Sequence, residues 1–149
     1  MPVFPSVEWF EAIKNIVNND PAFRQLGTID ATVGVKVGGK IYELTFEAFE
    51  CTGVREATEN DLRDMDFWLE QPYDSWKDML ENIKKNGKAD LSHTLNTIDL
   101  SAPEGFAKSH DGYRRDAFYR FNQSLQDFFN ASSKIDTQFA APEAVGASA

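Results

Sequence analysis

The sequence predicts an α+β domain in which helices cover one face of an antiparallel sheet. Apolar residues recur at helical spacing in the segments 6–20, 72–87 and 118–129. Between the first two of these, apolar and polar residues alternate along the segments 29–37 and 40–48, as they do in half-buried strands. Helical and strand patterns that are segregated along one chain are typical of the α+β class.

The N-terminal segment is predicted to form two consecutive helices. Ser6 is a favourable N-cap, and apolar residues then recur on one helical face as far as Val17. Asp20 and Pro21 form a second start signal, because proline fits the first position of a helix, and Gly27 is expected to end this short helix.

The centre of the chain is predicted to form the sheet. A two-residue turn at Gly38 and Gly39 joins the two alternating segments into a β-hairpin. A third strand is predicted at 54–58, and a fourth at 67–70 follows the acidic loop 59–66. These strands are expected to follow one another as an antiparallel meander.

A third helix is predicted to begin at Pro72 and to end before Gly87, which is a favourable C-cap. After it, the segment 92–100 is interpreted as an edge strand and the segment 102–112 as a loop. The apolar face of the helix consists of Trp76, Met79, Leu80 and Ile83.

The stretch FYRFNQSLQDFF at 118–129 holds four of the twelve phenylalanines in the chain. On a helix, its large apolar side chains fall within an arc of about 100°. Burying this face is worth on the order of 10 kcal/mol, so it packs as ordinary core, lines a ligand cavity or forms a dimer interface. The sequence leaves these three roles open. This aromatic stripe consists of Phe118, Phe121, Leu125, Phe128 and Phe129.

Composition and charge restrict the classes of function. The chain has 149 residues and a formal net charge of −9, which disfavours nucleic acid as a partner and steady attachment to anionic membranes. The lone Cys51 fits a reducing compartment, no apolar run is long enough to span a bilayer, and the first residues lack a signal-peptide pattern. We therefore expect a cytoplasmic protein with a single domain over 1–138 and a disordered tail over 139–149.

No motif predicts a chemical reaction. The sequence has no glycine-rich phosphate loop, no Cys-x-x-Cys pair and no His-Glu-x-x-His motif. His93 and His110 are too isolated to suggest a metal site, and Cys51 has no basic neighbour that would activate it as a nucleophile. Cys51 is expected to be a small buried hydrophobe, and neither a cofactor nor a metal ion is predicted.

One basic cluster precedes the aromatic stripe. It contains Lys108, His110, Arg114 and Arg115. These residues fit the head group of a ligand, a phosphate or a carboxylate, at the mouth of a binding site. A solvated loop at the start of a helix is the commoner origin of such a cluster, and the head-group contact is the alternative interpretation.

Two segments resemble the sterol carrier protein type 2 family of non-specific lipid-transfer proteins. They are GVKVGGKIYELTFEAFECTGVREA and MDFWLEQPYDSWKDML. Family members combine a glycine-turned hairpin that ends in an aromatic strand, a strand that follows an aspartate, and a helix that opens with proline and aspartate before a tryptophan. The resemblance covers residues 6–100. These features fall here on Gly38, Gly39, Phe46, Asp66, Pro72, Asp74 and Trp76.

The resemblance implies a sheet of about five strands covered by helices, with an apolar tunnel between the two layers. Members of the family carry sterols, fatty acids or fatty acyl-CoA, use no cofactor and catalyse no reaction of their own. The resemblance therefore implies lipid binding and lipid transport by a protein that is not an enzyme and that acts beside a lipid-metabolising enzyme. The sequence leaves open whether the protein is a monomer or a homodimer. Steroid or terpenoid intermediates of a bacterial degradation pathway are further ligands that fit this interpretation.

The predicted ligand site combines the aromatic stripe with the third helix and the hairpin. Flat rings suit the wall of an adaptable apolar cavity that contains few polar groups. Lys108, Arg114 and Arg115 are the candidate contacts to a polar head group. The predicted lining residues are Phe46, Trp76, Leu80, Ile83, Phe118, Phe121, Leu125 and Phe128.

The alternative is a small cofactor-free enzyme with the cone fold of ketosteroid isomerases, in which a buried aspartate abstracts a proton next to a carbonyl group. Asp30, Asp66 and His93 are the candidate residues for this chemistry. Cone-fold enzymes end in long strands of a curved sheet, whereas the last strong pattern in this chain is helical. The carrier is therefore the preferred hypothesis.

Overall fold

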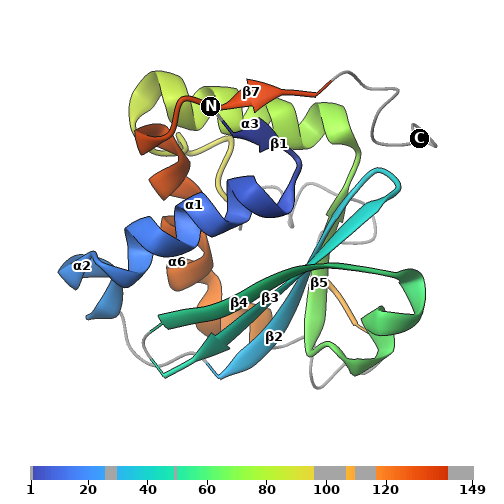
Figure 1. Cartoon of the computed structure of the whole chain (residues 1–149). Helices are drawn as coiled ribbons and strands as arrows, with labels where there is room; N and C mark the ends of the chain where they lie inside the picture. The colour runs from blue at the N-terminus through green and yellow to red at the C-terminus, as the bar shows by residue number, and fades with distance from the viewer. Residues whose placement is uncertain (1, 26–29, 49, 96–106, 110–116, 141–149) are drawn as a thin grey trace.

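The structure, a computed structural model, combines a sheet of strand order β4-β3-β2-β5-β6 with a layer of helices (Figure 1). It describes residues 2–25, 30–48, 50–95, 107–109 and 117–140, with the backbone alone for 117–120. The helices are α1 (Val7–Asn18), α2 (Pro21–Arg24), α3 (Tyr73–Asn86), α6 (Ala117–Asn130) and the 3-10 helices η1 (Glu59–Asp64) and η2 (Ala131–Lys134). The strands are β1 (Val3–Phe4), β2 (Ala31–Val37), β3 (Lys40–Glu47), β4 (Glu50–Ala57), β5 (Phe67–Gln71), β6 (Ala107–Lys108) and β7 (Gln138–Phe139).

Local signals set the ends of the helices, as predicted. The side chain of Ser6 caps α1 by accepting a hydrogen bond from the backbone N–H of Trp9 at 3.0 Å. Asp20 caps α2 in the same way, with a hydrogen bond of 2.9 Å from a backbone N–H of the first turn. Gly87 ends α3 with φ of 83°, the left-handed conformation that closes many helices. Gly27 lies outside the described residues.

β2 and β3 form the predicted hairpin. Val37 pairs with Lys40, and Gly38 between them has φ of 58°. Glycine adopts this conformation without steric cost at the first central position of a two-residue turn. The side chains of Val33 and Val35 both point towards the helices and are fully buried. This confirms the predicted inner face of β2.

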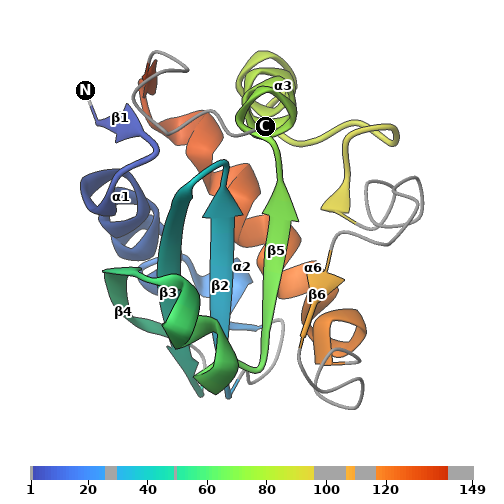
Figure 2. The same cartoon turned by 90° about the vertical axis from the view of Figure 1, so that its right-hand side faces the viewer.

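The predicted antiparallel meander is wrong at β5, which pairs in parallel with β2 instead of joining β4. After β4, the turns of η1 cross the outer face of the sheet to the free edge of β2 (Figure 2, green turns in front of the strands). Asp66 then holds the start of β5 against Thr32. Its N–H donates to the carbonyl of Thr32 at 2.9 Å, and its carboxylate accepts the N–H of Thr32 at 2.8 Å. The local sequence pattern carries no signal of this distant pair.

The edges of the sheet also differ from the prediction. β4 begins at Glu50, before the predicted segment 54–58, because its pairing with β3 extends to the end of that strand. The start of the predicted edge strand, Ser92 to Thr94, forms a turn instead, and 96–100 lies outside the described residues. The edge strand next to β5 is β6, which falls in the segment 102–112 that was expected to be a loop.

The first and last described segments pair with each other. β1 and β7 are parallel, and the N–H of Ala140 donates to the carbonyl of Phe4 at 3.0 Å. Phe139 and Ala140, which the sequence assigned to the tail, are therefore part of the folded unit. The remainder of the expected tail, 141–149, lies outside the described residues.

Gly34 of β2 faces the outer side of the sheet, where η1 and the start of β5 cover it. A Cβ at this position would lie 2.6 Å from Sδ of Met65 and 2.7 Å from Cβ of Trp68. Gly34→Ala should therefore lower the free energy of unfolding by about 1–3 kcal/mol through overpacking. Gly53→Ala in β4 is the matched control, because its Cβ would meet only Cβ of Thr45 at 4.0 Å. Urea unfolding measures both variants, and equal effects would contradict the close crossing of the outer face.

Candidate functional site

The C-terminal part of the aromatic stripe packs inside the chain, where Phe128 contacts Phe46 of β3 and Phe129 contacts Trp76 of α3. Leu125, Phe128 and Phe129 are all 0% exposed, so the centre of the stripe cannot form a dimer interface. Phe121, one turn earlier, is partly buried and packs against the same core. The backbone of Phe118 is helical, and its side chain lies outside the described part of the structure.

Rings from one strand and two helices touch in series. The ring of Phe46 in β3 lies 5.7 Å from that of Phe128, centroid to centroid, and Phe128 lies 5.5 Å from Phe129. Both pairs are nearly perpendicular, an arrangement that the quadrupoles of aromatic rings favour. Phe129 then lies 5.4 Å from Trp76 of α3, and Nε1 of Trp76 donates to the carbonyl of Lys36 at 2.9 Å. We call this series of contacts, with the apolar residues packed around it, the aromatic layer.

The structure brings most of the predicted lining residues into the aromatic layer. Helical spacing on α3 and α6 and alternation on β3 were sufficient to predict which faces meet. The spacing did not reveal that these side chains would touch one another directly, with almost no exposed surface. The predicted residues that share one buried cluster are Phe46, Trp76, Leu80, Ile83, Leu125 and Phe128.

Two buried side-chain amide atoms have no hydrogen-bond partner among the described residues: Nε2 of Gln71 and Oδ1 of Asn122. Gln71 pairs with Val37 at the end of β5, so its side chain lies on the sheet face that the helices cover. Asn122 directly follows Phe121 on α6. An unsatisfied buried amide costs on the order of 1–3 kcal/mol, so each atom is a place where a polar group of a ligand would gain a hydrogen bond. Sequence reasoning missed both, because an amide in an apolar pattern has no distinct signal.

A cavity of about 260 Å³ lies between α3 and the segment from η2 to β7. Leu80 belongs both to the buried cluster and to the lining of this cavity, so the cavity borders the apolar core at this residue. Ser132 contributes a buried hydroxyl without a partner in the described part of the chain. The lining residues are Leu80, Glu81, Lys84, Lys85, Ser132, Thr137 and Phe139.

Lys108, a predicted head-group contact, lies away from the aromatic layer. It pairs with Trp68 in the register of β6 and β5, so its side chain points to the outer face of the sheet. There its Nζ lies 3.6 Å from a carboxylate oxygen of Glu70. Arg114 and Arg115, the other two predicted contacts, lie outside the described residues.

The residues considered for catalysis have structural roles. Cys51 is 1% exposed, and burial raises the pKa of its thiol to about 12, so it stays protonated. The carboxylate of Asp30 accepts the N–H of Ala48 at 3.0 Å, and that of Asp66 anchors β5. Among the described residues, no three His, Cys, Asp or Glu side chains are placed to hold a metal ion together. In the same part of the chain, no helix has the length and apolar character needed to cross a bilayer.

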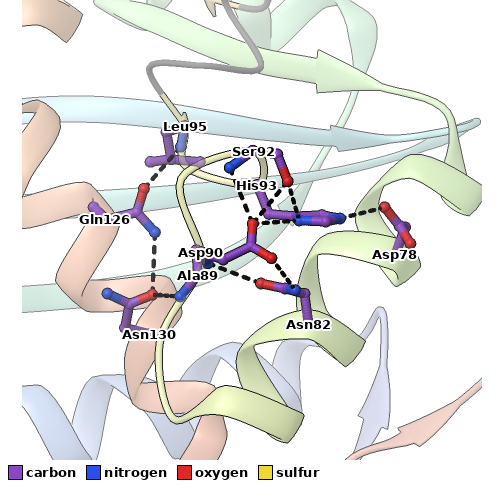
Figure 3. Close-up of polar contacts among 9 residues, drawn as sticks. All are labelled: Asp78, Asn82, Ala89, Asp90, Ser92, His93, Leu95, Gln126 and Asn130. Atoms are coloured by element: carbon purple, nitrogen blue, oxygen red, sulfur yellow. Dashed lines mark hydrogen bonds and ion pairs between the residues drawn. The ribbon is translucent and has the colours of Figure 1, made fainter.

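His93 is not isolated, which corrects the expectation from the sequence. Its Nδ1 lies 2.7 Å from Oδ1 of Asp90, and its Nε2 lies 2.8 Å from Oδ2 of Asp78 on α3 (Figure 3). These two carboxylates raise the pKa of His93, with Asp90 contributing most. Hydrogen bonds from His93 first, and then from Ser92 and Asn82, hold the pKa of the Asp90 carboxyl well below its usual range. The short spacing of Asp90 and His93 is visible in the sequence, but the approach of Asp78 is not.

Comparison with known proteins identifies the fold. No protein-family model matches the chain, and no curated protein matches it. The structure of sterol carrier protein 2 is similar, with a TM-score of 0.63 over 87% of this chain and 96% of that chain, at 16% sequence identity. A conserved hypothetical protein from Thermus thermophilus, described as a candidate sterol carrier protein, has a TM-score of 0.61 over 89% of this chain and 90% of that chain, at 17% identity. The chain therefore has the predicted sterol-carrier-protein-like α+β fold.

This fold contradicts the cone fold that the alternative hypothesis requires. A cone-fold chain would end in long strands of a curved sheet. Here the last described elements are the helices α6 and η2 and the two-residue strand β7. Asp30 and Asp66, its candidate bases, are engaged with backbone N–H groups.

The buried thiol of Cys51 should not react in the folded protein. Its folded pKa is raised to about 12, whereas a thiol in an unfolded chain ionises near about 8.5. A disulfide reagent at about pH 8 should therefore label Cys51 only after unfolding in urea. Because the unfolded state alone loses this proton, stability should also fall as the pH rises above about 8.5, and Cys51→Ala should lose that part of the pH dependence. Labelling of the folded protein as fast as that of the unfolded chain would show an accessible thiol.

Proposed function

We propose that the protein binds an apolar small molecule in the aromatic layer and carries it through the cytoplasm. The observation that carries this proposal is the convergence of Phe46, Trp76 and Phe128, from β3, α3 and α6, in one buried apolar layer. The similarity of fold to sterol carrier protein 2 supports it. Fatty acids, fatty acyl-CoA, sterols, and steroid or terpenoid intermediates have the matching chemistry. Such a carrier needs no cofactor and performs no reaction.

Leu80 provides the entry to the proposed site. It lines the cavity of about 260 Å³ and also belongs to the buried cluster, so an apolar tail that displaces its side chain would run from the cavity towards Ile83 and Leu125. Contacts between rings would be exchanged for contacts between rings and ligand. Because the rings of Phe128 and Phe129 carry no polar group, their displacement breaks no hydrogen bond, and burial of the ligand offsets the cost at about 25 cal/mol for each Å² of apolar surface.

The rim of the cavity suits a polar head group. Lys84 and Lys85 line the cavity, and the unpaired hydroxyl of Ser132 adds a hydrogen-bond donor and acceptor. The ammonium group of Lys84 also donates to the carbonyls of Ser133 at 3.4 Å and Ile135 at 3.0 Å. Glu81 lines the same cavity and opposes a strongly negative group. These charges favour a neutral or singly negative head group. For the larger head group of an acyl-CoA, Arg114 and Arg115 remain the proposed contacts.

The proposed partner is an enzyme that produces or consumes the carried lipid. A bacterial pathway that degrades steroids or terpenoids would need such a carrier, because its intermediates dissolve poorly in water. Leu125, Phe128 and Phe129 of the aromatic stripe are buried within a single chain, so we propose that the site is complete in a monomer.

A saturating apolar ligand should stabilise the protein. At a hundred times its dissociation constant, oleate or dehydroergosterol should add about 2.7 kcal/mol to the free energy of unfolding, whereas acetate or glycerol should add nothing. Leu80→Trp should abolish this response with little loss of stability, because the indole ring can enter the cavity of about 260 Å³. Thermal unfolding with and without each compound measures both effects.

Leu62→Ala is the matched control for Leu80→Trp. Leu62 is a buried leucine in the small cluster on the outer face of the sheet, away from the aromatic layer. Its truncation should cost about 2–5 kcal/mol yet leave the response to ligand intact. The carrier function would be refuted if the parent protein responds to no lipid and Leu80→Trp is badly destabilised. The aromatic layer would then be ordinary packed core.

A further inference from the structure

A strap formed by residues 88–95 leaves the end of α3 and lies along the side of α6 (Figure 3). Its residues Ala89 and Leu95 are buried in the same cluster as the aromatic layer. The N–H of Ala89 donates to Oδ1 of Asn130 at 3.1 Å, and the N–H of Leu95 donates to Oε1 of Gln126 at 2.7 Å. The strap is therefore one wall of the proposed ligand site, and two neutral hydrogen bonds anchor it to α6.

Between these two anchors, charged groups hold the strap to α3. Asn82 of α3 exchanges two hydrogen bonds with Asp90: its amide donates to the carboxylate at 2.8 Å and accepts the N–H of Asp90 at 2.9 Å. His93 bridges the carboxylate of Asp90 and that of Asp78 on α3, at 2.7 and 2.8 Å. Ser92 and the amides of α6 are neutral, so Asp78 and Asp90 are the charged groups that face His93 in the described part of the chain.

The bridge requires an imidazole that carries both protons. A neutral imidazole has one N–H and one lone pair, so it can donate to only one of the two carboxylates. The other contact would then place a lone pair against a negatively charged oxygen. With both protons present, both contacts are charge-assisted hydrogen bonds. Loss of one proton therefore weakens the attachment of the strap to α3.

We infer that His93 is a positioning residue whose proton holds the strap against α3 and thereby keeps the wall of the ligand site closed. The consequence for ligand rests on the proposed function: without this proton, Ala89 and Leu95 separate more readily from the layer, and the ligand dissociates faster. The pH range follows from the direction of the pKa shift. Because the bridge raises the pKa of His93, the held state is complete below about pH 6.5 and is lost as the pH rises through the higher folded pKa.

The test measures the full chain at about pH 6, below the ordinary histidine pKa, and at about pH 8.5, about two units above it. Nuclear magnetic resonance follows the titration of His93 and the exchange protection of the amides of Ala89 and Leu95. Stopped-flow fluorescence follows the dissociation of dehydroergosterol, an uncharged probe. The titration midpoint of His93 should exceed about 6.5. For each pH unit by which it does so, the protection factors of the strap amides should fall by up to about tenfold at the higher pH. The dissociation rate should rise over the same range.

His93→Gln should show the low protection and the fast dissociation at both pH values, because glutamine carries no titrating proton. His110→Gln is the matched control and should keep the transition of the parent. Protection that is independent of pH in the parent, or a transition that persists in His93→Gln, would overturn the inference.

Asp78→Asn keeps the inference testable if His93→Gln does not fold. Removal of this carboxylate should lower the midpoint of His93 and reduce the change in protection. Asp74→Asn, one turn earlier on α3, should alter neither. If the exchange protection of the strap amides falls at the higher pH while the dissociation rate of the sterol stays constant, the role of His93 in ligand exchange is overturned. Failure of the sterol to bind at either pH would contradict the carrier function, and the protection factors would still decide whether His93 holds the strap.

Discussion

Contact between aromatic rings on α6, on the sheet and on α3 is the interaction on which the rest of the structure depends. Phe128 and Phe129 are consecutive on α6, and one contacts Phe46 of β3 while the other contacts Trp76 of α3. A single helical turn thus joins the sheet to a second helix. Because Nε1 of Trp76 also donates to the carbonyl of Lys36, the orientation of α3 over the sheet is set at the same place. The cavity and the strap lie where they do because these contacts position α3 and α6.

The distance in sequence between interacting residues decides which features could be predicted. The cap at Ser6 and the turn at Gly38 depend on neighbouring residues, and periodicity alone identified the buried faces of the helices and of β2. The parallel pairing of β5 depends on Asp66 reaching a distant strand, so the local pattern suggested a meander instead. The bridge from His93 to Asp78 crosses between two elements in the same way. For this reason the sequence indicated the apolar part of the candidate site but missed the polar contacts of the strap beside it.

One buried layer is proposed to serve both stability and binding, and this imposes a physical conflict. A layer whose side chains are almost unexposed has no free volume for a ligand until something moves. Leu80 borders an existing cavity, so its displacement costs less than opening a close-packed core. The strap lies beside α6 and is bonded to α3 through His93, whose charge we infer adjusts how firmly the wall is held. Entry at Leu80 and control at His93 would let a stable fold exchange an apolar ligand.

Intermolecular nuclear Overhauser effects test the central claim most directly, because they locate the ligand within the fold. The measurement uses protein with isotopically labelled leucine methyl groups and unlabelled dehydroergosterol. The account predicts effects from sterol protons to the methyl groups of Leu80 and Leu125 and none to those of Leu62, which lies on the outer face of the sheet. Effects confined to Leu62, or none at either helix while the sterol is bound, would contradict the aromatic layer as the binding site.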